Sequence, residues 1–111
     1  MLPSINQTFK ERDKYREQMF KDAYGLDVTI QVTNFNDENW DWIKCILNFR
    51  DSMGKNYGLI EYFKEGTDNS TDYVNFEYEE NGVLKTLRFD RFIDAELALV
   101  EMIRKRLRGE G

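Results

Sequence analysis

Carboxylates and tryptophans gather in one stretch of the sequence, NFNDENWDWIKCILNFRD, which runs from Asn34 to Asp51. A carboxylate can bind a cation, transfer a proton in a cleft or attract a basic partner, and tryptophan is enriched among residues that dominate binding energy. A second acidic segment, EGTDNSTD, follows at residues 65–72. The two segments supply the candidate partner-binding residues, which are Asp37, Glu38, Trp40, Asp41, Trp42, Glu65, Asp68 and Asp72.

The residue types on which many catalytic and metal sites depend are absent or scarce in the chain. It has no histidine and one cysteine, and so lacks the usual general base, any Ser-His or Cys-His pair and a zinc ligand set. A calcium loop starting at Asp68 would place Tyr73 at its sixth position, where the sharp turn needs glycine. We therefore expect a non-enzymatic protein without metal or cofactor. A carboxylate pair in a cleft remains the alternative route to catalysis.

Size and composition predict a single folded domain that spans residues 1–111. Apolar residues make up 41% of the chain and aromatic residues 14%, too many for a disordered polyelectrolyte despite 33% charged residues. No apolar run is long enough to cross a membrane, and the first residues do not resemble a secretory signal. Together with the single cysteine, these features favour the cytoplasm.

Two helices are predicted, one at each end of the chain. The segment from Ser4 to Tyr24 has capping-box spacings at its start and Gly25 as its stop signal. Its charged part, KERDKYREQ, is expected to be a solvated helix face. The second helix is expected to begin after Asp90 as N-cap. Its predicted buried face consists of residues at helical spacing: Ile93, Leu97, Val100, Ile103 and Leu107.

Five strands are predicted between the helices, in the segments 26–35, 42–49, 57–64, 72–80 and 83–89, because apolar and polar residues alternate there. Asn81-Gly82 favours a two-residue hairpin turn, which would place Phe76 opposite Leu87. Cys45 alternates in phase with Ile43 and Leu47, so we expect it to be buried and unreactive.

Short connections between strands predict an antiparallel meander, and hence an α+β fold with a sheet of four or five strands and both helices on one sheet face. The residues predicted on the covered face are Val28, Ile30, Val32, Ile43, Cys45, Leu47, Val74, Phe76 and Leu87. Trp42 and Ile46 have the opposite parity and would point away from the helices. They either form a secondary cluster with Tyr73 and Leu84 or present a contact surface to a partner or a second copy.

The meander also predicts an uneven charge distribution. The net charge is −5, and the last eight residues, with four basic groups and one acid, carry +3, so the first 103 residues carry −8. The first and third connections, with their carboxylates and no lysine or arginine, would lie at one end of the sheet. The second connection, DSMGKN, would place Lys55 at the other end.

These features favour a small acidic protein-binding module that docks on the basic surface of a protein partner. Inhibitors of nucleic-acid enzymes, of the anti-CRISPR, anti-restriction or immunity/antitoxin type, would have this composition, which makes a phage or mobile element a candidate source. The alternative is a single-stranded nucleic-acid binder that uses the open sheet face, with Trp42 stacking on bases and Lys44, Arg50 and Arg88 contacting phosphates. The negative net charge disfavours nucleic acid. A homodimer through the open face is compatible with either function.

Overall fold

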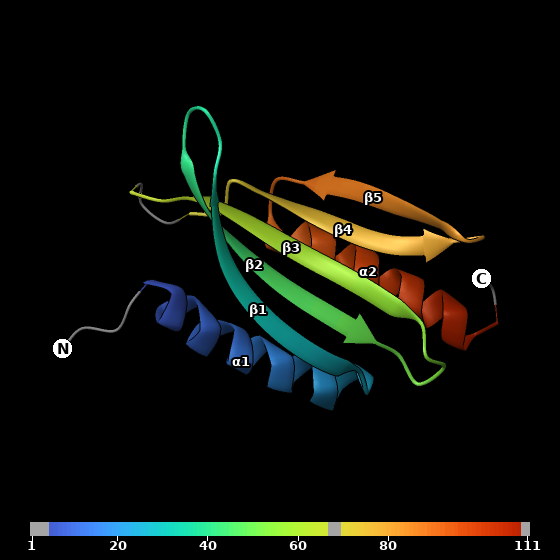
Figure 1. Cartoon of the computed structure of the whole chain (residues 1–111). Coiled ribbons are helices and arrows are strands. Elements are labelled where there is room, and N and C mark those ends of the chain that lie inside the picture. The colour runs from blue at the N-terminus through green and yellow to red at the C-terminus, as the bar shows by residue number, and fades with distance from the viewer. Residues whose placement is uncertain (1–4, 67–69, 110–111) are drawn as a thin grey trace.

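The computed structural model describes residues 5–66 and 70–109, which form two helices and one five-stranded sheet (Figure 1). The chain order is α1 (Ile5–Tyr24), β1 (Asp27–Asn36), β2 (Asp41–Arg50), β3 (Asn56–Lys64), β4 (Tyr73–Glu80), β5 (Val83–Phe89) and α2 (Phe92–Leu107). The strands lie in the sheet in their sequence order and every neighbouring pair is antiparallel. The predicted α+β meander is confirmed. Ser4, the proposed first cap of α1, lies outside the described residues.

The turn at Asn81-Gly82 sets the register of the last hairpin. Both residues have positive φ, at 54° and 79°, which is the conformation that this dipeptide tolerates better than others. Phe76 lies opposite Leu87 and Glu80 opposite Val83, as predicted. A shift of one residue would move the apolar side chains of both strands to the other face, so the turn and the burial pattern specify the same pairing.

Both helices cover the same face of the sheet. α1 packs on β1 and β2, and α2 packs on β3, β4 and β5. Phe20 of α1 and Leu99 of α2 belong to one buried cluster with Phe49, Leu59 and Phe76 of the sheet. A smaller cluster around Phe9, Cys45 and Phe63 fills the space under the first half of α1. Most of the predicted covered face is buried, but Leu87 is 42% exposed because β5 is the edge strand.

The predicted buried face of α2 is wrong in part. Val100 and Ile103 are buried, but Ile93, Leu97 and Leu107 are exposed. The helix instead turns Ala95, Leu99 and Ile103 toward the sheet. α2 has two overlapping rows of apolar residues, the predicted row and the row that contains Ala95. The small side chain of Ala95 lets the helix lie close to the strands, so the second row faces the sheet. The N-cap is Arg91 and not Asp90, and its side chain pairs with Asp94 at 3.0 Å instead of capping the helix.

Candidate functional site

The β1–β2 hairpin extends beyond the rest of the sheet and ends in a tight acidic turn (Figure 1). Oδ1 of Asp37 accepts hydrogen bonds from the backbone N–H groups of Asn39 at 2.9 Å and Trp40 at 2.7 Å. Oδ2 of the same carboxylate accepts a bond of 2.9 Å from Nε1 of Trp42. These bonds, that from Trp42 first, lower the pKa of Asp37 below its ordinary value. The turn is therefore held in one conformation by an ionised side chain.

Trp42 lies inside a group of rings on the open face of the sheet. Its ring is stacked on Phe35, with centroids 6.0 Å apart and planes 6° apart, and meets the edges or faces of Tyr62 and Tyr73 at 6.4 and 6.1 Å. The side chain is only 8% exposed. Of the two interpretations of Trp42, the secondary cluster is confirmed, with Tyr73 as a member and with Leu84 exposed outside it. We call Phe35, Trp42, Tyr62 and Tyr73 the aromatic cluster.

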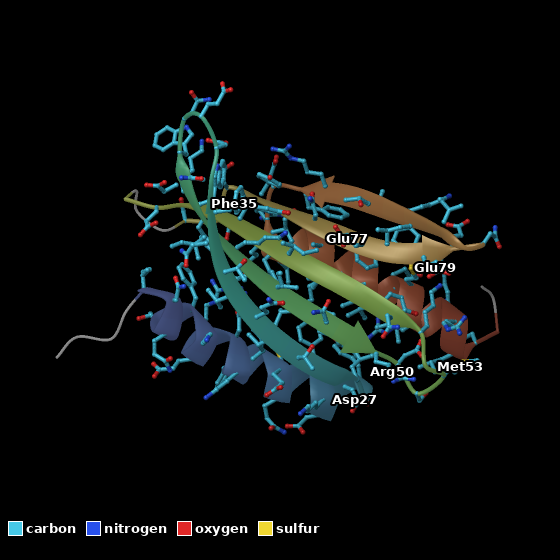
Figure 2. All side chains as sticks on the ribbon, viewed as in Figure 1. Asp27, Phe35, Arg50, Met53, Glu77 and Glu79 are labelled. Carbon is cyan, nitrogen blue, oxygen red and sulfur yellow. The ribbon has the colours of Figure 1, made fainter. Side chains whose placement is uncertain are left out.

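Two large aromatic side chains at this end remain open to solvent. Trp40 is 45% exposed. Phe35, which lies opposite Trp42 close to the turn, is 41% exposed (Figure 2). The ammonium group of Lys64 lies 4.9 Å from the ring centroid of Trp40 and 5.6 Å from that of Trp42. The exposed ring of Trp40 thus lies beside a cation that also contacts the buried ring of Trp42, which limits the positions that Trp40 can take.

The two acidic connections meet at one end of the sheet, as the meander predicted. The backbone N–H of Glu65 donates to the carbonyl of Asp41 at 2.8 Å. Together with Phe35, these two residues line a shallow cavity of about 280 Å³. The end is less uniformly acidic than predicted, because Lys64, the last residue of β3, pairs with Asp72 at 3.4 Å. Asp68 lies outside the described residues.

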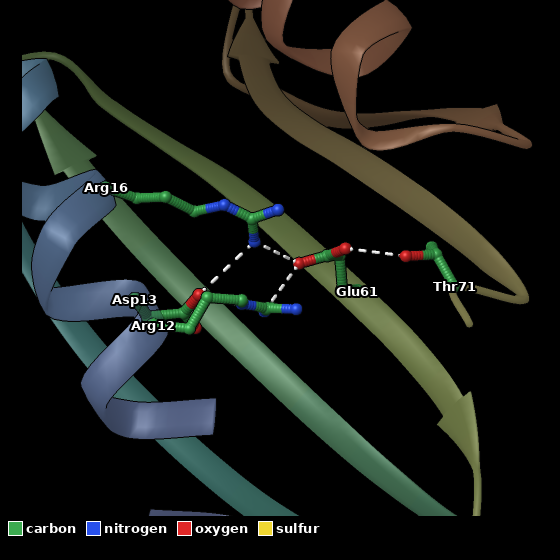
Figure 3. A network of polar contacts seen from close by, with 5 residues as sticks. All are labelled: Arg12, Asp13, Arg16, Glu61 and Thr71. Atoms are coloured by element: carbon green, nitrogen blue, oxygen red, sulfur yellow. Dashed lines mark hydrogen bonds and ion pairs between the residues drawn. The ribbon is translucent and has the colours of Figure 1, made fainter. Parts of the chain in front are cut away.

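Sequence reasoning missed a second polar site, formed by Arg12, Asp13, Arg16, Glu61 and Thr71 (Figure 3). Asp13 is fully buried and Glu61 is 2% exposed. Nη2 of Arg12 lies 2.8 Å from Oε1 of Glu61 and 2.9 Å from Oδ1 of Asp13, and Arg16 pairs with the same two carboxylates. Thr71 donates its hydroxyl to Oε2 of Glu61 at 2.9 Å. We call these five residues the ionic cluster.

The ionic cluster corrects the prediction that KERDKYREQ is a solvated face, because Arg12 and Arg16 turn toward the sheet. Burial raises the pKa of Asp13, whereas the two guanidinium groups oppose that rise. Arg16 also lies over the ring of Phe92 at 3.7 Å and so links α1 to the start of α2. A signal was present in the sequence. Glu61 occupies a covered-face position between Leu59 and Phe63, and a charge at such a position needs an opposite charge.

Cys45 lies in the covered face, as predicted, and belongs to the smaller core cluster. Burial, and then the charge of Asp13, raises the pKa of its thiol to about 12. A thiol with this pKa is almost entirely protonated near neutral pH, and only the thiolate is a good nucleophile. Within the described ranges, 5–66 and 70–109, no group of three or more Cys, Asp or Glu side chains is arranged to hold a metal ion.

On the open face, rings and cations are already in contact with each other. The guanidinium of Arg88 lies 3.9 Å from the ring centroid of Tyr73, and the ammonium of Lys44 lies 5.8 Å from that of Tyr62. With Trp42 buried, the stacking surface expected for a nucleic-acid binder is reduced to the partly exposed rings around it.

No protein-family model, no curated protein and no solved structure matches the chain. Among the residues that the structure describes, neither helix has the length and apolar character to span a membrane.

Proposed function

We propose that the protein is a small binding module without catalytic activity, which docks on a basic surface of a partner protein. The docking residues are five exposed side chains at the β1–β2 end of the sheet: Phe35, Glu38, Trp40, Asp41 and Glu65. We call this set the hairpin surface. The observation that carries the proposal is the exposed indole of Trp40 on a turn that Asp37 holds in one conformation.

The geometry of the turn supports this proposal in energetic terms. Binding usually costs the ordering of loops and side chains at the interface, and a turn fixed before binding avoids much of that cost. Asp37 accepts hydrogen bonds from the backbone of the turn, and Trp42, which packs in the aromatic cluster, donates a hydrogen bond to Asp37. In this arrangement Asp37 and Trp42 position the surface, whereas Trp40 contacts the partner.

The charges of the hairpin surface support a basic partner. Glu38, Asp41 and Glu65 are exposed, and complementary charge mainly speeds association and selects the partner. Trp40 lies among these carboxylates and would supply the buried contact that dominates affinity. A cationic groove that normally holds phosphates fits these requirements, so we extend the proposal to inhibitors of nucleic-acid enzymes.

The test is affinity capture from the lysate of the source organism with four forms of the protein. They are the wild type, Trp40→Ala, the triple variant E38Q/D41N/E65Q and a control, D27N/E79Q/E101Q, which removes three exposed charges elsewhere. Asp27 and Glu79 lie at the end of the sheet opposite Phe35 (Figure 2). A protein held by the wild type and the control but lost from both hairpin variants supports the proposal. Equal capture by all four forms contradicts it.

The inhibitor class has its own test. If the captured protein acts on nucleic acid, we expect the wild type to reduce that activity and to compete with the nucleic acid for the enzyme. Binding without competition would support the proposal that the protein is a binding module but contradict its assignment as an inhibitor.

A further inference from the structure

A cavity of about 420 Å³ lies at the end of the molecule opposite the hairpin surface. It forms where the β2–β3 turn, the β4–β5 turn and the last turns of α2 come together. Its wall combines cationic, amide and apolar side chains: Lys55, Tyr78, Asn81, Met102, Lys105 and Arg106. A second hollow, of about 340 Å³, shares Lys55, Asn81 and Arg106 with the first.

Positive charge converges at this cavity in a chain whose net charge is −5. Three of its wall residues are cations, which come from two segments about 50 residues apart in the sequence. The wall also contains Glu80, but its carboxylate already lies 3.5 Å from the ammonium of Lys85. The second hollow also has Glu79 in its wall. Arg106 is shared with the carboxylate of Asp51, so Lys55 and Lys105 supply the excess positive charge by which the larger cavity attracts anions, in contrast to the acidic hairpin surface.

A buried carboxylate holds the two basic segments in place. Nε of Arg106 donates to Oδ2 of Asp51 at 3.2 Å, and the hydroxyl of Tyr57 donates to the same oxygen at 3.1 Å. Oδ1 of Asp51 accepts the backbone N–H groups of Met53 and Lys55, both at 2.9 Å. One side chain thus fixes the turn that carries Lys55 and the helix end that carries Arg106, before any ligand arrives.

The end of α2 would ordinarily repel an anion, because unpaired carbonyls give it a partial negative charge. Here the backbone N–H of Arg108 donates to the carbonyl of Arg104 at 3.1 Å, and that of Gly109 to the carbonyl of Arg106 at 3.0 Å. These bonds satisfy two of the last carbonyls, and Lys55 and Lys105 oppose the partial negative charge that remains.

We propose that this cavity binds a small phosphomonoester. The phosphate dianion would contact Lys55, Lys105 and Arg106, since charge-assisted hydrogen bonds to phosphate are among the stronger polar contacts. The apolar body of the ligand would lie on Tyr78 and Met102. The volume falls within the range of about 300–1,000 Å³ that small-molecule sites occupy.

The test is an NMR titration of isotope-labelled protein with phenyl phosphate. We expect saturable shifts of the amides of Lys55, Asn81 and the α2 residues from Met102 to Arg106. Phenol, which has the same ring without the charge, should cause no saturable shift at this site. Inorganic phosphate, which lacks the apolar body, should bind there more weakly than phenyl phosphate.

Variants then separate a site from general charge attraction. K55Q/K105Q should weaken phenyl phosphate binding by about tenfold or more, which corresponds to about 1.4 kcal/mol. The matched control, K10Q/K14Q, changes the net charge equally on the exposed side of α1 and should bind as the wild type does. Thermal melts of both variants check that they are folded.

Several results would overturn the proposal. One is the absence of saturable shifts up to about 10 mM phenyl phosphate, a concentration that would fill a site with a Kd of about 1 mM to roughly nine-tenths. Others are an equal loss of affinity in the control variant, or benzoate binding as tightly as phenyl phosphate, which would assign the cavity to carboxylates. A single-stranded oligonucleotide that shifts the same amides at lower concentration would make the end a nucleic-acid contact instead.

Discussion

Nε1 of Trp42 donates a hydrogen bond of 2.9 Å to Oδ2 of Asp37, five residues earlier in the same hairpin. The bond joins a buried ring to an exposed turn, so the packing of the aromatic cluster also holds the turn in place. It also divides the roles of the two tryptophans. Trp42 is buried and stabilises the hairpin, whereas Trp40 is exposed on the hairpin surface.

Asp37→Asn should loosen the turn without unfolding the domain. The amide cannot replace both carboxylate oxygens, because its NH₂ group cannot accept the indole N–H. The folded-state pKa of Asp37 is lowered, so its contribution to stability is complete above the unfolded value of about 3.9 and is lost as pH falls through the folded value. Tryptophan fluorescence should therefore change at low pH in the wild type and not in the variant. An identical acid profile for both proteins would contradict the prediction.

The two tryptophans should respond in opposite ways to replacement by alanine. Trp42→Ala removes a buried ring and should lower the free energy of unfolding by about 3–5 kcal/mol. Trp40→Ala should leave unfolding nearly unchanged and weaken partner binding by about 2 kcal/mol or more. Chemical denaturation and a binding titration of both variants measure the two quantities. If Trp40→Ala costs as much stability as Trp42→Ala, the exposed ring has no separate binding role.

The aromatic cluster shows what sequence alone could predict at this site. Strand parity placed Trp42 on the open face and the meander brought Asp41 next to Glu65, because both depend on local pattern. Whether Trp42 is buried in a cluster or exposed to a partner could not be decided from the sequence, since its burial depends on Tyr62 and Tyr73 from two other strands. Strand alternation predicts the sheet face on which a side chain lies, but not which neighbours cover it.

The rest of the fold divides in the same way between features that local patterns predict and features that depend on distant contacts. The register at Asn81-Gly82 follows from one dipeptide and was predictable. The buried face of α2 was not, because two apolar rows compete and close packing on the sheet selects one of them. The ionic cluster joins Glu61 to arginines 45 and 49 residues away, so no local pattern could pair them.

Glu61→Gln should destabilise the domain by about 2–4 kcal/mol. The change leaves Arg12 and Arg16 without one of their two carboxylates in a largely buried place, and breaking a buried ion pair costs about 3–5 kcal/mol. We expect a smaller loss of stability than for a fully buried pair, because the side chains of Arg12 and Arg16 are 33% and 21% exposed. Glu77→Gln is the matched control on the open face of β4 and should change stability by less than about 0.5 kcal/mol. Equal unfolding curves for the two variants would show that the ionic cluster adds nothing to stability.

Cys45 should react slowly with a thiol reagent in the folded protein. Its pKa of about 12 leaves roughly one thiolate in 10,000 at pH 8, and the surrounding core restricts access. The rate of labelling by a chromogenic disulfide, measured with and without denaturant, tests this. Labelling at the rate of the unfolded chain would contradict a buried thiol.

Replacing the exposed carboxylates of the hairpin surface should change how fast the partner binds and not how stable the domain is. The triple variant E38Q/D41N/E65Q omits Asp37, because that side chain holds the turn. Exposed charges contribute little to stability, so the melting temperature should stay nearly constant. Charges at the rim of an interface steer the encounter instead, so association should slow and its dependence on salt should flatten. Stopped-flow association at two ionic strengths measures both effects, with D27N/E79Q/E101Q as the control of equal net charge. If the control slows association as much as the hairpin variant does, the net charge and not the hairpin surface attracts the partner.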